Sequence, residues 1–174
     1  RKLFSGFIYI MENLFTYGPK SSIYLYSREY LKVNKVDIII APGEPFILFK
    51  YASKLSKEYN IPWIADYRDA WIQNKTRRKN LLFREFDKAM EKKYLKNVHT
   101  IITVSEYLKN QISSLISNKP FKILTNGFDP IISKYSSEIK QKNNNLSIGF
   151  MGTIYPWHPI KAFLETCFKA SQNL

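Results

Sequence analysis

The feature that most constrains this chain is a regular alternation of short apolar strands with longer amphipathic segments. Four runs rich in β-branched residues are typical of buried strands. They are "VDIIIA" (36–41), "IPWIAD" (61–66), "VHTIITV" (98–104) and "FKILT" (121–125). Strands that alternate with helices pair in parallel through right-handed crossovers. The pattern therefore predicts a doubly wound α/β layer around a mostly parallel sheet.

The segments between the strands have apolar residues at helical spacing, and two similar segments precede the first strand. Helices are therefore expected over 7–15, 21–33, 46–60, 80–97 and 106–115. Pro45 suits the first turn of its helix, and Ser105 suits an N-cap. We interpret the lysines and glutamates of 85–96 as a solvated helix face.

A change in composition divides the chain. Residues 133–145 ("SKYSSEIKQKNNN") are polar and lysine-rich, which indicates a linker or an exposed loop. A further strand (146–151) and a helix (160–174) are expected after it. We therefore predict an incomplete first domain over 1–132 and the first βα unit of a second domain over 146–174. One βα unit cannot close a core, so we expect the protein to continue after residue 174. The chain does not begin with Met, so we also expect it to continue before residue 1.

Composition limits the partners that this chain can have. It has 27 Lys and Arg residues against 14 Asp and Glu, a formal net charge of +13. This excess favours nucleic acid, anionic lipid or phosphorylated substrates. A single cysteine, Cys167, excludes a disulfide framework, and no apolar run approaches the ~20 residues that span a bilayer. No His, Cys, Asp and Glu spacing is typical of metal ligands, so we expect no metal site.

Charged residues follow the second strand directly, in "IADYRDAW" (64–71). Ligands of parallel α/β sheets bind beyond the carboxyl ends of the strands, where Asp66, Arg68 and Asp69 are expected. Carboxylates there can orient hydroxyls or accept a proton, and an arginine can hold a phosphate. The alternative is structural: Arg68 pairs with Asp66 or Asp69 and clamps a loop.

Three other turns are weaker candidates. In "APGEP" (41–45), Gly43 permits close approach of a ligand and Glu44 can contact a hydroxyl, although an ordinary βα turn explains both. "TNGFD" (125–129) ends the last strand of the first domain on a common turn dipeptide. The glycine in "FMGTIYPWH" (150–158) can offer backbone N–H groups to a phosphate, or simply make a tight turn. His158 lies in the same loop.

Together, these pieces resemble the retaining glycosyltransferases of family 4, which have the GT-B fold. The likeness extends over about residues 36–165 and depends on the order and spacing of four stretches. They are "VDIIIAPGEPFILFKYASKLSKEYNIPWIADYRDAW" (36–71), "TIITVSEYLKNQI" (100–112), "KILTNGFD" (122–129) and "LSIGFMGTIYP" (146–156).

The resemblance implies two Rossmann-like domains across a cleft, the N-terminal one for the acceptor and the C-terminal one for the nucleotide-sugar donor. On this basis the catalytic residues are Asp66 and Asp69, the acceptor-binding residues are Gly43, Glu44, Arg68 and Trp71, and the donor-binding residues are Gly152, Thr153, His158 and Lys161. Many family members have an arginine and a lysine where this chain has Thr153 and His158. Here either backbone N–H groups suffice, or Lys161 replaces them, or the donor binds weakly.

The resemblance also implies partners. The expected co-substrate is a nucleotide sugar, without a cofactor or an obligatory metal, and the acceptor is a glycan or a lipid-linked sugar of surface polysaccharide synthesis. The protein is expected in the cytoplasm, either free or on anionic lipid at the inner membrane face, and not on nucleic acid. The donor-holding glutamates are expected beyond residue 174, so residues 1–174 alone should be inactive. The alternative is a non-catalytic basic α/β module that binds nucleic acid or anionic lipid.

Overall fold

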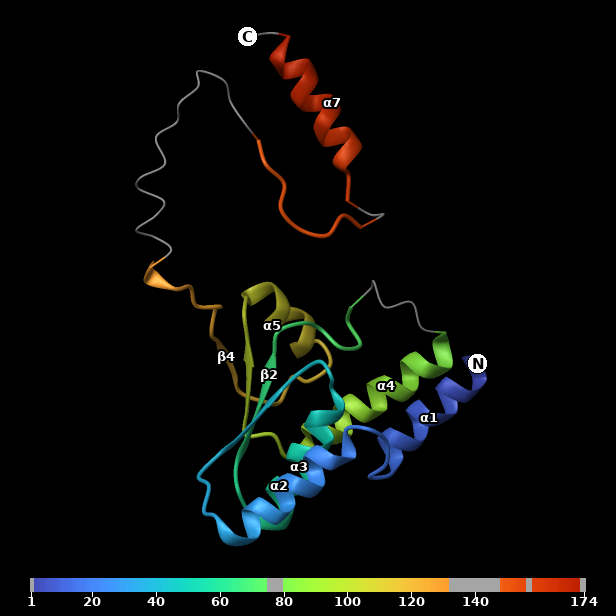
Figure 1. Ribbon diagram of the computed structural model, residues 1–174, viewed down its shortest axis with the longest axis vertical. Helices are drawn as coiled ribbons and strands as arrows, with labels where there is room; N and C mark the ends of the chain where they lie inside the picture. The colour runs from blue at the N-terminus through green and yellow to red at the C-terminus, as the bar shows by residue number, and fades with distance from the viewer. Residues whose placement is uncertain (1, 75–79, 132–147, 156–157, 173–174) are drawn as a thin grey trace. The chain divides into compact units, whose positions relative to one another are not determined.

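The computed structural model describes residues 2–74, 80–131, 148–155 and 158–172 (Figure 1). The chain divides into two compact units, Arg1–Gly127 and Phe128–Leu174, which are described separately. Within the described residues, no helix has both the length and the hydrophobicity needed to cross a membrane.

The first unit is built on a parallel sheet of four strands in the order β1-β2-β3-β4. The strands are β1 (Ile39–Pro42), β2 (Trp63–Tyr67), β3 (Thr100–Thr103) and β4 (Phe121–Ile123). In the central register, Ala41 lies opposite Ala65, and Ala65 lies opposite Ile101. All four predicted strands are confirmed, each shorter than its apolar run.

Helices α3 (Ile47–Tyr59), α4 (Leu81–Tyr94) and α5 (Glu106–Ser113) connect the strands, and a short 3-10 helix (Leu95–Asn97) follows α4. Because the strands follow one another in sheet order, right-handed crossovers place these helices on the same face. On that face Trp63, Ala65 and Ile101 are fully buried, whereas Ile40 on the other face is 61% exposed. The α/β class and the Rossmann-like parallel sheet are confirmed. A doubly wound fold has a layer of helices on each face of its sheet. The described residues contain one of these layers, formed by α3, α4 and α5.

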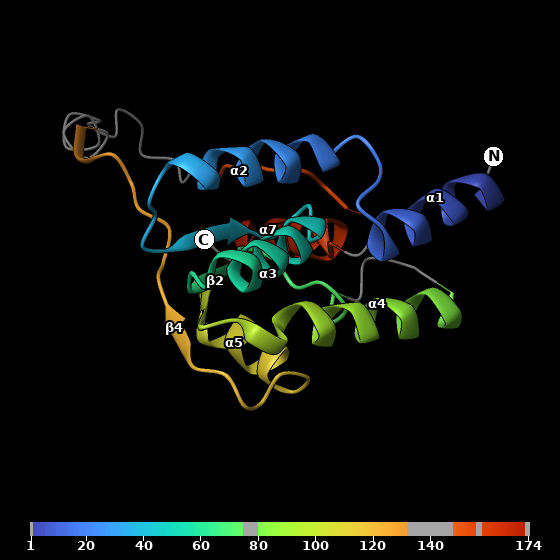
Figure 2. The same ribbon diagram turned by 90° about the horizontal axis from the view of Figure 1, so that it is seen from below.

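Two N-terminal helices, α1 (Lys2–Leu14) and α2 (Ser21–Val33), pack against the connecting helices, as Figures 1 and 2 show. The Tyr9 ring of α1 lies 6.3 Å from the Phe83 and Phe86 rings of α4. The centres of the Tyr24 ring of α2 and the Tyr51 ring of α3 lie 5.5 Å apart. The buried Lys50 ammonium of α3 donates to two carbonyl oxygens at the end of α1, those of Glu12 and Phe15. These contacts hold α1 against the domain.

Of two residues predicted to mark helix starts, Ser105 does so and Pro45 does not. Ser105 is the N-cap of α5, because its hydroxyl accepts from the Leu108 backbone N–H at 3.2 Å. Pro45 does not lie in the first turn of α3, which begins at Ile47. The chain turns before that helix instead, where Glu44 has a φ of 59° and the Glu44–Pro45 peptide is cis.

The charged run of α4 corrects the sequence interpretation. Asp87 is 1% exposed and Glu91 is fully buried, whereas Glu85 and Lys92 are exposed. The prediction of a solvated face over 85–96 is therefore wrong for these two acids. They lie four residues apart, on the side of α4 that faces α1 and the sheet.

The second unit contains α7 (Ile160–Ser171), which confirms the predicted helix. Residues 148–151, the described part of the predicted strand 146–151, are not in a strand. A strand needs a hydrogen-bonded neighbour, and the described residues of this unit contain no other strand. The predicted linker 133–145 lies outside the described residues. The predicted boundary at residue 132 falls shortly after Gly127, where the first unit ends.

Candidate functional site

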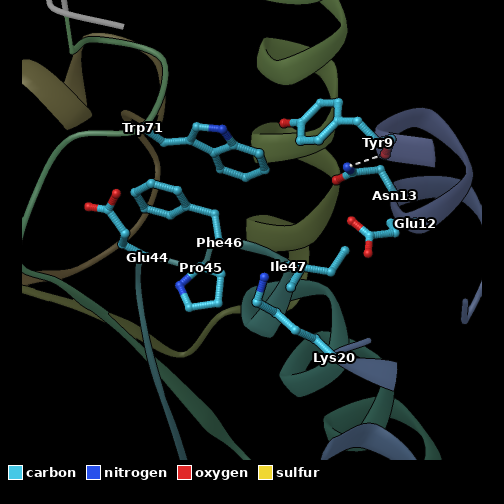
Figure 3. A pocket seen from close by; sticks show the side chains of 9 residues that line it. All are labelled: Tyr9, Glu12, Asn13, Lys20, Glu44, Pro45, Phe46, Ile47 and Trp71. Carbon is cyan, nitrogen blue, oxygen red and sulfur yellow. Dashed lines mark hydrogen bonds between the residues drawn. The ribbon is translucent and has the colours of Figure 1, made fainter. Parts of the chain in front are cut away.

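A pocket of about 260 Å³ lies beside the carboxyl ends of β1 and β2, and we call it the β1–β2 pocket. It is lined by Tyr9, Glu12, Asn13, Lys20, Glu44, Pro45, Phe46, Ile47 and Trp71 (Figure 3). Three separate segments meet there: α1 with the loop after it, the turn between β1 and α3, and the loop after β2. Parallel α/β sheets bind ligands at this edge.

An aromatic stack forms one wall of the pocket. The Phe46 and Trp71 rings are nearly parallel, 4.9 Å apart with an interplanar angle of 2°, as Figure 3 shows. Trp71 also stacks on Tyr94 of α4 at 5.9 Å. Trp71 is only 4% exposed, so it acts as a fixed wall. Such a wall can lie against the apolar face of a bound ring.

Polar groups of α1 and the following loop form the facing wall. The Asn13 amide donates to the Tyr9 carbonyl oxygen at 2.8 Å, and the Tyr94 hydroxyl donates to Asn13. The Tyr9 hydroxyl donates to an Asp87 carboxylate oxygen at 2.5 Å. Burial, and then this hydrogen bond, raise the pKa of Tyr9, so its hydroxyl stays protonated. Glu12 and Lys20 add a carboxylate and an ammonium to this wall.

Glu44 occupies an unusual backbone position at the tip of β1. Its φ of 59° lies in the left-handed region, which non-glycine residues rarely adopt. Such conformations cost about 1–3 kcal/mol and cluster at functional sites. The side chain is exposed. A carboxylate held there can accept hydrogen bonds from ligand hydroxyls.

Arg68 joins the ends of two strands. Its Nε lies 3.0 Å from both Asp66 carboxylate oxygens and hydrogen-bonds to Oδ2, and a guanidinium nitrogen donates to the Asn126 side-chain oxygen at 2.7 Å. Asp66 Oδ1 is shielded from solvent and, among the described residues, accepts no hydrogen bond. The "IADYRDAW" and "TNGFD" segments therefore meet at one sheet edge. This agrees with the structural alternative, in which Arg68 pairs with Asp66.

Asp69 organises its own loop. One carboxylate oxygen accepts from the Ala70 backbone N–H at 2.8 Å, and the other accepts from the Asn74 amide at 2.9 Å. Of the six residues predicted in this domain, Glu44 and Trp71 line the pocket, while Gly43, Asp66, Arg68 and Asp69 do not. The roles predicted for these residues stay predictions.

Gly43 is placed by packing. Its N–H donates to the Asp66 carbonyl oxygen at 2.7 Å. A Cβ at this position would lie 2.9 Å from a Phe46 ring carbon, 3.2 Å from a Phe49 ring carbon and 3.3 Å from the Asp66 carbonyl oxygen. The absent side chain therefore lets the β1 turn lie against the aromatic wall.

The four predicted donor-binding residues belong to the second unit. Gly152 has a φ of 146°, which a side chain would strain. The Tyr155 backbone N–H approaches His158 Nδ1 at 3.3 Å, and the two rings pack edge to face. Lys161 lies 3.9 Å from Glu165 on α7. Thr153 lies beside Gly152 and is exposed.

Sequence reasoning missed Tyr9, Glu12, Asn13 and Lys20. A signal was present in "FIYIMENLF" (7–15), where Glu12 and Asn13 interrupt an apolar and aromatic stretch. Asn13 is buried, so it needs hydrogen-bonding partners. Within the described ranges, no group of three His, Cys, Asp or Glu side chains is arranged to hold a metal ion.

A parallel α/β sheet covered by its connecting helices has the architecture of the Rossmann-like class, whose ligands bind at the carboxyl edge of the sheet. The family model described as Glycosyltransferase Family 4 matches residues 7–131, most of the chain. The chain therefore belongs to glycosyltransferase family 4, and a glycosyltransferase function follows in general terms. No curated protein matches the chain, and no solved structure does.

Proposed function

We propose that this chain carries the acceptor-binding domain of an enzyme that transfers a sugar from a nucleotide sugar to a glycan or lipid-linked acceptor, in surface polysaccharide synthesis. The β1–β2 pocket supports this proposal most directly. It combines an aromatic wall with hydroxyl, amide, carboxylate and ammonium groups, which suit the two faces of a sugar. Its position at the carboxyl edge of the sheet also suits ligand binding.

In this proposal the acceptor sugar lies against the stack of Phe46 and Trp71. Glu44 accepts a hydrogen bond from an acceptor hydroxyl at the pocket mouth, where its strained backbone holds it. Gly43 and Arg68 shape the site from behind, the first through close packing and the second through its bonds to Asp66 and Asn126. Acceptor specificity then depends on the three segments that meet there.

Catalytic roles are proposed for Asp66 and Asp69. Asp66 retains an oxygen without a hydrogen bond, which supports a role in orienting a hydroxyl once the acceptor rearranges the strand tip. Asp69 holds the loop that carries Trp71, so its contribution includes positioning. Asp69→Asn keeps the shape of the side chain and removes its charge. It therefore shows whether transfer depends on the charge of Asp69 or only on the loop geometry.

Donor binding is proposed for Gly152, Thr153, His158 and Lys161. The backbone N–H groups around Gly152 and the Lys161 ammonium would meet the donor diphosphate, without a metal or another cofactor. Because the donor-holding glutamates are expected outside this chain, residues 1–174 alone should not transfer sugar.

Peripheral contact with the cytoplasmic face of an anionic membrane is also proposed. Its support is the net charge of +13 together with exposed aromatic side chains on α1 and the loop after it, Phe4, Phe7, Phe15 and Tyr17. Binding to vesicles with phosphatidylserine should fall when Phe4 and Phe7 are replaced by serine. Unchanged binding would contradict this part of the proposal.

The deciding experiment incubates the full-length protein with radiolabelled UDP-hexoses and GDP-hexoses and a lipid extract of the source cells as acceptor. We expect label in the lipid fraction. Glu44→Gln should raise the KM for the acceptor by about ten-fold, as expected for one lost charged hydrogen bond, and leave the donor KM unchanged. Glu29→Gln, an exposed glutamate on α2, is the matched control.

Two results would change the conclusion. Unchanged transfer by Asp69→Asn would remove the Asp69 charge from the mechanism. No transfer from any donor, together with DNA or vesicle binding that falls steeply with salt, would favour the non-catalytic basic module. Flat or absent binding would count against that module.

A further inference from the structure

Two buried acids on α4 lie behind the β1–β2 pocket, and neither lines it. Asp87 is 1% exposed and Glu91 is fully buried, one helical turn apart on the same side of α4. Two carboxylates that close together in a protein interior are costly unless each has hydrogen-bond donors. The donors that each acid has found belong to the elements that form the pocket.

Asp87 accepts from α1. The Tyr9 hydroxyl donates to its Oδ1 at 2.5 Å, a short charge-assisted bond. Tyr9 and Trp71 both line the β1–β2 pocket (Figure 3). Asp87 therefore fixes the side chain of Tyr9, which lines the pocket from α1.

Glu91 accepts from β2 and from the loop after it. The Tyr67 hydroxyl donates to one carboxylate oxygen at 2.8 Å, and the Ile72 backbone N–H donates to the other at 3.4 Å. Ile72 directly follows Trp71, so this second bond restrains the backbone that carries the aromatic wall. It is long for a hydrogen bond and depends on the negative charge of Glu91.

The charge of Glu91 changes near neutral pH. Burial raises its pKa from the ordinary value of 4.5 to about 7, and the neighbouring Asp87 carboxylate adds to this. The hydrogen bonds from Tyr67 and the Ile72 backbone act in the opposite direction. Among the described residues, Tyr67 on β2 and Asp87 on α4 are the ionisable groups that act on Glu91. Burial raises the pKa of Tyr67 well above its usual value, so it stays protonated. Protonation of Glu91 weakens the hold on the loop.

We propose that Asp87 and Glu91 are positioning residues of the β1–β2 pocket, with Asp87 holding Tyr9 in the α1 wall and Glu91 restraining the Trp71 loop in a proton-dependent way. Only the expected effect of these residues on sugar transfer rests on the proposed acceptor function. The placement of the walls can be tested without any sugar.

The first experiment follows the indole N–H resonance of Trp71 by NMR in 15N-labelled protein, assigned with Trp71→Phe. In the wild type it should shift with a midpoint near pH 7. In Glu91→Gln it should stay at the acid position at every pH, because the amide cannot ionise. Glu85→Gln is the matched control, since Glu85 is exposed on the same helix beside Lys88. A wild-type resonance that does not titrate, or a Glu91→Gln resonance that still does, would overturn the role of Glu91.

The second experiment tests Asp87. Asp87→Asn should displace the Trp71 resonance at pH 8, because the short bond to Tyr9 loses its charge and Tyr9 lines the same pocket as Trp71. If this variant fails to fold, Tyr9→Phe removes only the hydroxyl and should displace the same resonance. Tyr107→Phe is the control, because Tyr107 is exposed on α5. A Trp71 resonance unmoved by the Asp87 variant, or by Tyr9→Phe in its place, would refute this role.

The third experiment measures transfer by the full-length protein, with the same lipid extract as acceptor. The wild-type acceptor KM should be about three-fold higher below pH 7 than above it, the effect of one weak hydrogen bond. In Glu91→Gln this pH dependence should vanish, with kcat and donor KM following the wild type. If the indole titration depends on Glu91 but the acceptor KM does not, the positioning role stands and the proposed acceptor pocket fails.

Discussion

At the scale of single residues, Gly43 controls how closely the β1 turn approaches the aromatic wall. Gly43→Ala would place a Cβ 2.9 Å from Phe46 and 3.3 Å from the Asp66 carbonyl oxygen. Because the backbone atom cannot give way cheaply, we expect a loss of about 1–3 kcal/mol in the free energy of unfolding, measured with urea. Gly127→Ala is the control, since a Cβ there meets nothing within 4 Å. Equal stabilities of the two variants would refute the packing argument.

Glu91 makes a separate prediction about stability and pH. Its pKa is about 7 in the folded protein against 4.5 ordinarily, so the folded state binds its proton more tightly than the unfolded chain. Its contribution to stability is therefore complete below pH 4.5 and is lost as the pH rises through about 7. The loss amounts to about 3 kcal/mol.

Glu91→Gln should therefore be more stable than the wild type at pH 8 and similar to it at pH 5. Urea unfolding at the two pH values measures this difference, and Glu85→Gln should follow the wild type at both. If Glu91→Gln is less stable than the wild type at pH 8, the ionised Glu91 bonds with Tyr67 and Ile72 outweigh the cost of burying its charge.

At the scale of the elements, the start of α5 depends on a single side chain. Ser105 has extended backbone and its hydroxyl accepts from the Leu108 N–H. Ser105→Ala should lower the free energy of unfolding by about 1 kcal/mol, because it leaves a helix donor without its partner. Ser113→Ala, at the other end of α5, should change it by less than about 0.5 kcal/mol. A similar loss in both variants would show that the cap contributes nothing specific.

The position of α1 explains most of the pocket. This helix lies against α4 through Tyr9, and its last carbonyl groups are held by Lys50 of α3. Its polar residues therefore face the ends of β1 and β2, although α1 contributes no strand to the sheet. An amphipathic pattern predicts that a helix packs, but it does not state which neighbour it packs against.

At the scale of the whole molecule, the two compact units differ in what they bury. Among the described residues, the buried core clusters run from Tyr24 to Ile116, whereas α7 has no buried residue. A chain shortened to residues 1–131 should therefore unfold cooperatively, with a midpoint within a few degrees of the 174-residue chain. Circular dichroism during heating measures this. A large fall in the midpoint would mean that the second unit stabilises the first.

Sequence patterns alone determined the order of the elements. The β-branched runs around Ile39, Ile64 and Ile101 predicted the strands, and Ser105 predicted a helix start. Each signal is local, because strand propensity and capping depend on a few neighbouring residues. The family likeness of the motifs followed from the same order, and the matched family model confirms it.

Only the tertiary structure decided which charged residues are buried and which loops meet. Asp87 and Glu91 look like the exposed Glu85 and Lys92 in the sequence, and their burial follows from the side of α4 that faces Tyr9 and Tyr67. Arg68 reaches Asn126, far along the chain, because parallel strands bring their carboxyl ends to one edge. Residues 148–151 have strand-like composition but no strand, since a strand forms only beside a partner. Such pairings join residues distant in sequence, and local patterns do not encode them.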